Sequence, residues 1–361
     1  MKGSIFNFYA GGNTAQGYAN LFDSSFQALE RVFLLEGVAG TGKSINICSI
    51  GNQLAEEGYS IWMIHCSSDN DALDGIIIPA LKLGIIDGTS PHISVPELSD
   101  VELVHANLRE ACHEERLESQ RSEIERLNEE ISQAYELAYS GFAEALRVHD
   151  DWEKLYITNM DFQAADELTK EMIENLYSDR QIEKLSRVDH RFLGAATPRG
   201  AIDFVPNLSD GLKRYLIKGR PGSGKSTMLK KLAAVAVDRG FDVEIYHCGF
   251  DPNSLDMVIV RELGFAIFDS TAPHEYYPDR PSDEIVDMYE RCIKPGTDEQ
   301  YSEAISLIKE RYSSTMKQST QYLARARSLL DELEQIHIQS TDLSILEGIA
   351  EEIKQRITVT N

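Results

Sequence analysis

The sequence predicts an α/β protein made of two tandem modules, each with a parallel sheet and a long, hairpin-like helical insertion or arm. Three observations support this prediction. The stretch GVAGTGKS (37–44) returns as GRPGSGKS (219–226), other features recur at the same separation of 182 residues, and a charge-rich helical segment follows each repeated part. A fixed repeat period is stronger evidence for architecture than local propensity.

The chain length of 361 residues suits two domains, each large enough to bury its own core. We expect a first module at 1–186, with its core at 1–98 and its arm at 99–186. The second module is expected at 187–361, with its core at 187–281 and its arm at 282–361. Each arm is expected to belong to the core that precedes it.

The chain is acidic, with a formal net charge of −24. Nucleic acid is attracted by basic surfaces, so a nucleic-acid partner is not expected. The sequence shows neither a signal peptide nor an apolar run long enough to span a membrane, and its five cysteines form no C-x-x-C pair. These features predict a cytoplasmic protein with reduced thiols and no membrane partner.

Each half opens with a short strand and a possible tight turn. Ile5–Ala10 leads to Thr14 and Gly17, and RFLGAATPRG (191–200) leads to Thr197 and Gly200. Glycine three residues after threonine suits a tight turn. The alternative is that each turn borders the base or ribose of a nucleotide.

The two repeated stretches fit the phosphate-binding pattern G-x-x-x-x-G-K-S. Each follows an apolar strand (32–35 and 215–217) and precedes an amphipathic helix (43–57 and 225–239). In such a loop, backbone N–H groups and the helix N-terminus bind phosphate, the lysine reaches the β and γ phosphates, and the serine binds Mg²⁺. The predicted ligands of the nucleotide are Gly37, Gly40, Thr41, Gly42, Lys43 and Ser44, with Gly219, Gly222, Ser223, Gly224, Lys225, Ser226 and Thr227.

A glycine ends each of these helices, Gly58 and Gly240, and a strand follows at 60–65 and 242–247. This order predicts a parallel crossover unit. Each strand ends in a His-Cys pair, at 65–66 and 247–248, and both residue types are common zinc ligands. Adjacent strand residues point to opposite faces, so a half-buried strand end is the preferred interpretation.

Polar residues repeat beyond these strands. Asp69, Leu73, Asp74, Asp87, Thr89, Pro91 and His92 match Asp251, Leu255, Asp256, Asp269, Thr271, Pro273 and His274 at the same offset. Asp87 and Asp269 each follow an apolar strand, where a carboxylate can bind Mg²⁺. We therefore expect Mg²⁺ to be held by Ser44 and Asp87 and by Ser226 and Asp269. Alternatively, each aspartate only begins a turn.

Neither of these two aspartates is followed by glutamate, so another group would have to orient water or an acceptor hydroxyl. The candidates are Asp69, Asp74 and His92, with Asp251, Asp256 and His274 in the other half. With Lys43 and Lys225, the four aspartates outside the metal site are the predicted catalytic residues. Aspartates at loop starts are also common as helix caps, and the Pro-His pairs also suit rigid turns.

The segments 99–186 and 282–357 have apolar residues at three and four spacing among dense charges. This pattern is typical of long amphipathic helices, which we expect to form an antiparallel hairpin within each arm. Ile157 and Asp161 match Ile338 and Asp342 at an offset of 181. The charged faces are expected to be solvated, with a protein partner or self-association as the alternative.

Together, the two loops and the repeated D-G-T-S-P-H and D-S-T-A-P-H segments resemble the tandem P-loop ATPase-like proteins of Bacillus-type bacteria. The resemblance covers nearly the whole chain. It implies two tandem P-loop NTPase modules with helical insertions and implies no particular substrate.

The expected function is binding of ATP with Mg²⁺ and hydrolysis of the γ phosphate at one or both sites. Arg220 and Arg199 are candidates for stabilising the transferred charge, and one half could complete the other's site across a pseudo-two-fold axis. ATP is favoured over GTP because no N-K-x-D motif is present. The alternatives are a nucleotide or small-metabolite kinase, and a nucleotide-dependent switch that holds a protein through its arms.

Overall fold

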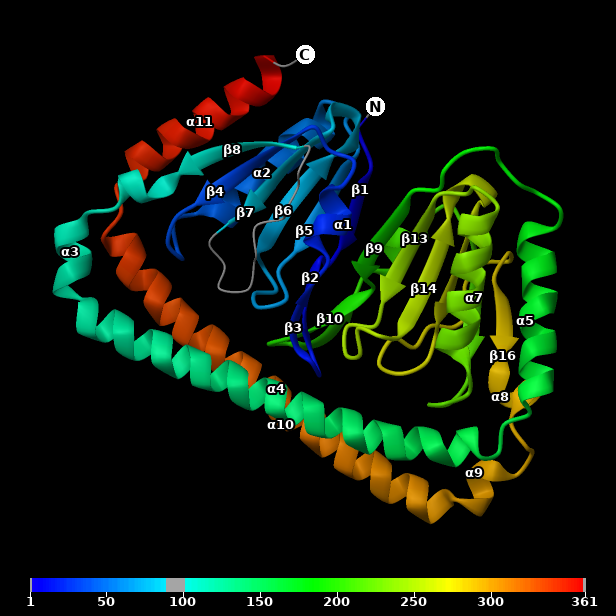
Figure 1. The fold of residues 1–361 in the computed structure, drawn as a ribbon. Helices are drawn as coiled ribbons and strands as arrows, with labels where there is room; N and C mark the ends of the chain where they lie inside the picture. The colour runs from blue at the N-terminus through cyan, green and yellow to red at the C-terminus, as the bar shows by residue number, and fades with distance from the viewer. Residues whose placement is uncertain (1, 89–100, 360–361) are drawn as a thin grey trace.

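The computed structural model describes residues 2–88 and 101–359 and contains two α/β modules linked by long helices (Figure 1). Thr89, Pro91 and His92 lie outside the described residues. Within the described part of the chain, no helix has the length and apolarity needed to cross a membrane.

The first module is built on a six-stranded sheet. In spatial order its strands are β1 (Ile5–Phe8), β5 (Ile61–His65), β6 (Leu73–Ile78), β7 (Leu83–Asp87), β4 (Arg31–Glu36) and β8 (Glu102–Asn107). The second sheet repeats this arrangement. Its strands are β9 (Val188–Phe192), β13 (Val243–His247), β14 (Leu255–Val260), β15 (Phe265–Asp269), β12 (Lys213–Lys218) and β16 (Glu284–Asp287).

Both sheets are mainly parallel, so the expectation of wholly parallel sheets was wrong for one strand in each. β6 is antiparallel to β5 and β7, and β14 is antiparallel to β13 and β15. The connections at 66–72 and 79–82 are too short for a parallel crossover, which needs a dozen residues or more. β7 lies beside β4 and β15 beside β12, both in parallel register.

One helix in each module follows the glycine-rich loop and packs on the sheet: α2 (Lys43–Glu56) and α7 (Lys225–Asp238). The predicted bounds are confirmed to within one residue. Gly58 and Gly240 end these helices with φ of +103° and +79°, a conformation that favours glycine.

The shorter helical elements connect or flank the sheets. They are α1 (Phe22–Phe26), η1 (Pro79–Leu81), η2 (Leu108–Ala111), α3 (Glu114–Ser119), α6 (Val205–Leu208), η3 (Arg261–Leu263), α8 (Met288–Cys292) and α9 (Thr297–Gln300).

The two long helices, α4 (Arg121–Ile157) and α10 (Ser302–Gln339), lie antiparallel against each other (Figure 1). A hairpin within each arm was therefore the wrong expectation, because the hairpin forms between the arms. Phe142 and Ala138 of α4 share one buried cluster with Leu323 and Ala326 of α10. The apolar stripe of each helix is buried by the corresponding stripe of the other.

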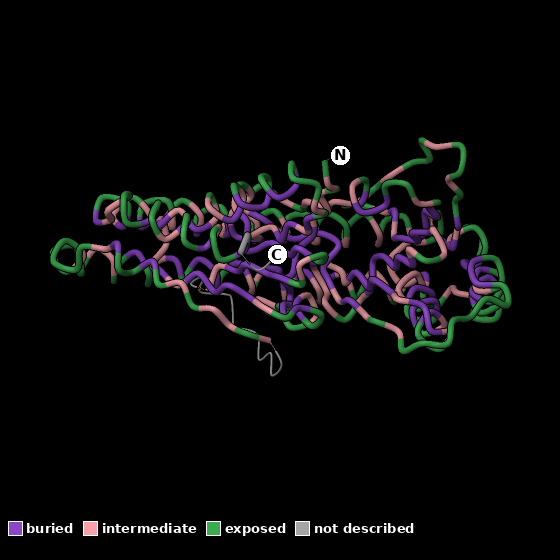
Figure 2. The backbone as a smooth tube through the Cα atoms, turned by 90° about the horizontal axis from the view of Figure 1, so that it is seen from above, coloured by how far each residue is buried: buried purple, intermediate pink, exposed green. Residues whose placement is uncertain are grey.

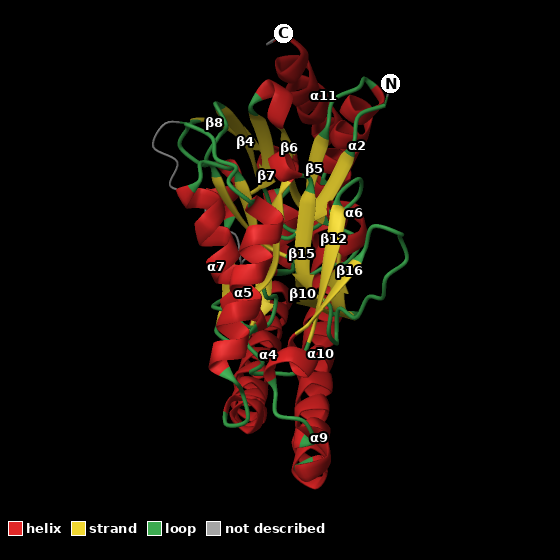
Figure 3. Ribbon diagram, turned by 90° about the vertical axis from the view of Figure 1, so that its right-hand side faces the viewer, coloured by secondary structure: helices red, strands yellow, loops and turns green. Residues whose placement is uncertain are grey.

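Each long helix leads to a shorter helix that packs on the opposite module. α5 (Phe162–Tyr177) follows α4 and lies beside α7 (Figure 3), with Leu168 and Met172 in the core of the second module. α11 (Leu343–Val359) follows α10, and its Leu346 and Ile353 enter the core of the first module. The arms thus exchange between the modules.

The modules also contact each other directly. Phe26 of α1 and Leu208 of α6 belong to one buried cluster that draws on both sheets. Asn207 of α6 accepts a hydrogen bond from the Asn7 backbone N–H at 2.8 Å and donates to the Ile5 carbonyl at 2.8 Å. Buried segments consequently continue from one half of the chain into the other (Figure 2).

Two antiparallel hairpins complete the contact between the modules. They are β2 (Gly11–Thr14) with β3 (Gly17–Asn20), and β10 (Gly194–Thr197) with β11 (Gly200–Asp203). The predicted tight turns are confirmed: each threonine hydroxyl donates to the carbonyl of the glycine three residues later, at 2.7 Å. β2 and β10 lie against each other.

Candidate functional site

The two glycine-rich loops have matching backbones. Each joins a strand to a helix, β4 to α2 and β12 to α7, and the lysine is the first helical residue. Gly40 and Gly42 have φ of +77° and +69°, and Gly222 and Gly224 have +74° and +88°. These left-handed conformations favour glycine, which explains its spacing in both loops.

The lysine of each loop lies between the loop and the carboxylate that follows the neighbouring strand. Lys225 Nζ donates to the Arg220 carbonyl at 2.9 Å and lies 3.5 Å from Asp269. Lys43 Nζ donates to the Val38 carbonyl at 2.7 Å and lies 3.7 Å from Asp87. The adjacency of β12 with β15, and of β4 with β7, creates this pairing.

Burial also affects the charge of the first lysine. Burial lowers the pKa of Lys43, while the nearby carboxylates of Asp87 and Glu334 oppose that change. Glu334 belongs to α10, so the second half of the chain contributes to the electrostatics of the first loop.

The loop serines point toward the start of the antiparallel strand. Ser44 Oγ accepts a hydrogen bond from the Leu73 N–H at 2.7 Å, and Ser226 Oγ accepts one from the Leu255 N–H at 2.9 Å. Ser226 and Asp269 offer an alcohol and a carboxylate oxygen beside a phosphate-type loop. Mg²⁺ takes few protein oxygens and keeps water or phosphate as its other ligands, so this donor set fits Mg²⁺.

Thr41 and Ser223 stabilise the loops from within. Their buried hydroxyls donate to the carbonyls of Val38 and Arg220, each at 2.8 Å. These hydroxyls are therefore used by the loop itself, while the backbone N–H groups of both residues belong to the predicted phosphate cradle.

The buried aspartates Asp74 and Asp256 lie next to the residues that contact the loop serines. Burial raises the pKa of Asp74 to about 8 and that of Asp256 to about 6, and the charges of Asp87 and Asp269 respectively act in the same direction. Asp74 is hydrogen-bonded to the buried thiol of Cys66. These carboxyl groups are thus less acidic than ordinary aspartates.

The repeat-related Asp69 and Asp251 have different surroundings. Asp69 Oδ2 lies 3.3 Å from Arg327 Nη1 of α10, and the same guanidinium lies 3.1 Å from Glu334. Asp251 accepts a hydrogen bond from the Asn253 N–H at 3.1 Å. Within residues 2–88 and 101–359 no cation lies within 4.0 Å of Asp251, which leaves this carboxylate available to a ligand.

The long helices cover the loops of the opposite half. A Cβ on Gly40 would lie 2.7 Å from the Glu334 carbonyl oxygen of α10, and one on Gly222 would lie 2.6 Å from that of Glu153 in α4. The two contacts are equivalent under the repeat. Each half therefore contributes to the loop site of the other, as the pseudo-two-fold hypothesis supposes.

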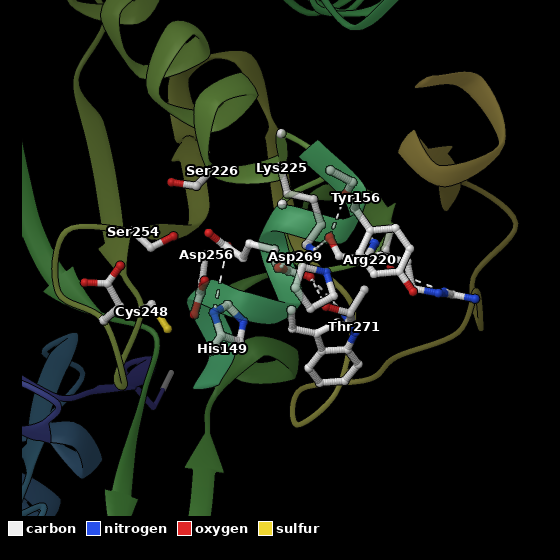
Figure 4. A pocket seen from close by; sticks show the side chains of 18 of the residues that line it. His149, Tyr156, Arg220, Lys225, Ser226, Cys248, Ser254, Asp256, Asp269 and Thr271 are labelled. Atoms are coloured by element: carbon white, nitrogen blue, oxygen red, sulfur yellow. Dashed lines mark hydrogen bonds and ion pairs between the residues drawn. The ribbon is translucent and has the colours of Figure 1, made fainter. Parts of the chain in front are cut away.

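A cavity of about 1120 Å³ opens at the second loop, between α4, α10 and the sheet (Figure 4). Lys225, Ser226, Asp256 and Asp269 line it. It also contains residues that the sequence analysis missed, notably His149, Trp152, Glu153, Phe250 and Tyr312. The alignment of the arms at an offset of 181 pairs Glu153 with Glu334, but no sequence signal indicates that these positions cover the loops.

His149 of α4 also lines this cavity. Burial, with a contribution from the charge of Lys225, lowers the pKa of His149, and Glu153 opposes this at an Nδ1 to Oε1 distance of 3.8 Å. His149, Asp150 and Glu153 bring ligand-type atoms within 4.8 Å of one another. Asp150 is exposed, so we assign no ion to this cluster.

The two arginine candidates point to other partners. Arg220 contacts Asp298 at 2.8 Å, and its guanidinium lies 4.7 Å from the Tyr289 ring centroid. Arg199 forms an ion pair with Asp71 of the first module. Both arginines are thus held by carboxylates other than those beside the loop lysines, and Arg327, which was not among the predicted residues, pairs with Asp69 of the first site.

The remaining predicted residues have local partners. His274 bonds to Asp203 at 2.7 Å. Burial is the largest single influence and acts to lower its pKa, but the hydrogen bond to Asp203 and the charges of nearby carboxylates together raise it. In the His-Cys pairs, His65 contacts Asn7 at 2.8 Å while Cys66 faces Asp74. The two members of that pair therefore have different neighbours, as expected for opposite strand faces.

No protein-family model matches this sequence, and no curated protein or solved structure matches it either.

Proposed function

We propose that the chain is a tandem P-loop NTPase that binds ATP with Mg²⁺ at its glycine-rich loops and hydrolyses the γ phosphate at the second. The observation that supports this most is the convergence of Lys225, Ser226 and Asp269 at the mouth of a large cavity. A lysine, a hydroxyl and a carboxylate in this arrangement suit phosphoryl chemistry, which depends on positioning and charge stabilisation.

The loop N–H groups and Lys225 would bind and orient the β and γ phosphates. To do so, Lys225 exchanges its hydrogen bond with the Arg220 carbonyl for bonds with phosphate oxygens. Ser226 and Asp269 would hold Mg²⁺, which neutralises phosphate charge when bound. α4 lies directly on the loop and excludes water from its outer side.

Two groups in the cavity can accept a proton from the attacking water. Asp251 has its carboxylate available, and His149 is neutral at pH 7 because burial lowers its pKa. In the first site the residue that corresponds to Asp251 is Asp69, which pairs with Arg327. We therefore assign hydrolysis to the second site and nucleotide binding without fast turnover to the first.

A second candidate function is phosphoryl transfer to a small acceptor. The cavity volume of about 1120 Å³ favours it, because single small-molecule sites usually occupy about 300–1,000 Å³. The partner-binding switch is less favoured, since α4 and α10 bury their apolar stripes against each other.

The test combines nucleotide stoichiometry with turnover. Lys43→Ala and Lys225→Ala serve as matched controls for each other, because their sites are related by the repeat. We expect wild-type protein to bind two molecules of ATP in equilibrium dialysis, and each single variant to bind one. Phosphate release should be lost in Lys225→Ala and retained in Lys43→Ala. Turnover unaffected by Lys225→Ala, or by both substitutions together, would refute the proposal.

A further inference from the structure

Four aromatic side chains from three separate segments form one side of the cavity at the second loop. They are His149 and Trp152 of α4, Phe250 of the loop before β14 and Tyr312 of α10 (Figure 4 labels His149). The Tyr312 ring centroid lies 5.8 Å from His149, 6.2 Å from Trp152 and 6.0 Å from Phe250. We call these four residues the aromatic wall. All four are only partly buried, so their rings are accessible from the cavity.

The aromatic wall lies on the side of the site where the terminal phosphate is expected. The charges of Cys248 and Asp256 contribute, after burial, to the raised pKa of Tyr312, so this ring lies close to both groups. Asp256 directly follows Leu255, whose N–H contacts Ser226, a predicted Mg²⁺ ligand. The wall is thus close to Asp256 and to the side of the loop where Ser226, a predicted Mg²⁺ ligand, lies.

The four positions of the first half that correspond to the aromatic wall hold no aromatic residue. By the repeat offsets, Leu330, Leu333, Ser68 and Ile131 occupy the positions of His149, Trp152, Phe250 and Tyr312. Leu333 and Ile131 are instead buried in the cluster between α4 and α10. Tyr135 and Tyr139 of α4 fill the equivalent region of the first half, where their rings stack with centroids 5.9 Å apart and Tyr135 is buried. The rings at the second loop differ because they line a cavity.

We propose that the aromatic wall binds a second small molecule, a planar heteroaromatic compound of nucleoside size, beside the terminal phosphate of the bound nucleotide. This inference rests on the proposed function, because the loop must hold the triphosphate for the two ligands to meet. Aromatic side chains bind planar bases by stacking, and Asp251, Asn253 and Lys309 line the same cavity and offer polar contacts. The size of the cavity accommodates both ligands.

The chain has two tryptophans, which provides a direct assay. Trp62 stacks on Phe6 between β5 and β1, away from the cavity, so Trp62→Phe leaves Trp152 as the sole tryptophan, whose emission is excited selectively over that of the tyrosines. The Trp62→Phe variant is saturated with Mg²⁺ and the non-hydrolysable ATP analogue AMP-PNP. It is then titrated separately with adenosine, guanosine, cytidine and uridine. Binding of AMP-PNP is measured separately by equilibrium dialysis.

We expect at least one nucleoside to change Trp152 fluorescence saturably while AMP-PNP stays bound. Tyr312→Leu should weaken that nucleoside about tenfold, and Tyr312→Phe, which keeps the ring, should bind it as wild type does. Phe250→Leu should weaken it similarly, with AMP-PNP binding unchanged in every variant.

Three results would overturn the inference. They are no response to any of the four nucleosides, an equal affinity of the Leu and Phe variants of Tyr312, and competition between AMP-PNP and the nucleoside. Competition would mean that the wall holds the base of the triphosphate itself. Failure of the proposed function would be recognised separately: the protein would then not bind AMP-PNP in equilibrium dialysis.

Discussion

Arg327 provides the sharpest test of the exchanged arrangement of the arms. It belongs to the second half of the sequence, yet its guanidinium lies 3.3 Å from Asp69 in the first module and 3.1 Å from Glu334. Its counterpart at the offset of 181 is Leu146. Arg327→Leu therefore gives α10 the leucine that α4 has at the corresponding position. Because leucine and arginine have similar helix propensities, the substitution should not weaken the helix itself.

Arg327 pairs with three carboxylates, and the expected cost follows from the two that are mostly buried, because the third, Asp331, is 60% exposed and contributes little. Asp69 and Glu334 keep 23% and 27% of their side-chain surface exposed. Hydrogen bonds to charged groups contribute about 1.5–3 kcal/mol when fully buried. Discounting for solvent, we assign about 1 kcal/mol to each, so the free energy of unfolding should fall by about 2 kcal/mol. With an unfolding entropy of about 2.1 cal/mol/K per residue, a chain of 361 residues should then lose about 3 °C in melting temperature.

The control is Arg325→Leu on the same helix. Arg325 contacts Glu130 at 3.1 Å with 55% of its side chain exposed, a surface pair that contributes about 1 kcal/mol at most. Thermal unfolding followed by circular dichroism compares the two variants with wild type. Equal losses for the two substitutions would refute the idea that Arg327 ties α10 to the first module.

Three other perturbations test separate features. Gly222→Ala should lower the melting temperature more than Gly264→Ala: the two glycines have φ of +74° and +75°, but only at Gly222 does an added Cβ meet the Glu153 carbonyl. Equal effects would contradict the contact of α4 with the second loop. Asp74→Asn should gain stability relative to wild type as pH rises from 5 to 8. The raised pKa of Asp74, about 8, means that wild type loses stability as pH climbs from the unfolded-state value through the folded one; urea midpoints with a pH-independent difference would exclude this. Asn207→Ala removes three hydrogen bonds between the modules and should cost about 3 kcal/mol in urea unfolding; no loss would show that they add nothing to the module contact.

Much of the fold could be predicted because its signals are local. The helix after each loop begins at Lys43 and Lys225, and glycine ends both helices as the pattern indicates. The direction of each strand was harder to predict from the sequence. The run at 73–78 reads LDGIII, with no alternation of apolar and polar residues, so its pattern does not reveal that β6 returns antiparallel between β5 and β7.

Part of the candidate site was also predictable. Placing an aspartate after the strand next to the loop strand is enough to bring Asp269 near Lys225, and the structure has them 3.5 Å apart. The contributions of Trp152, Tyr312 and Arg327 were not predictable. They lie on amphipathic helices where aromatic and charged residues have many ordinary uses, and no spacing marks them as neighbours of a loop.

The sequence by itself determined the two loops, the strands and helices on either side of them, and the repeat that relates the halves. These features follow from short-range physics: backbone hydrogen bonding, the positive φ that glycine tolerates, and apolar periodicity. Only the tertiary structure decided that α4 covers the second loop and α10 the first. An apolar stripe specifies that a helix is buried but not against which surface, and that choice depends on how both modules and both arms pack at once.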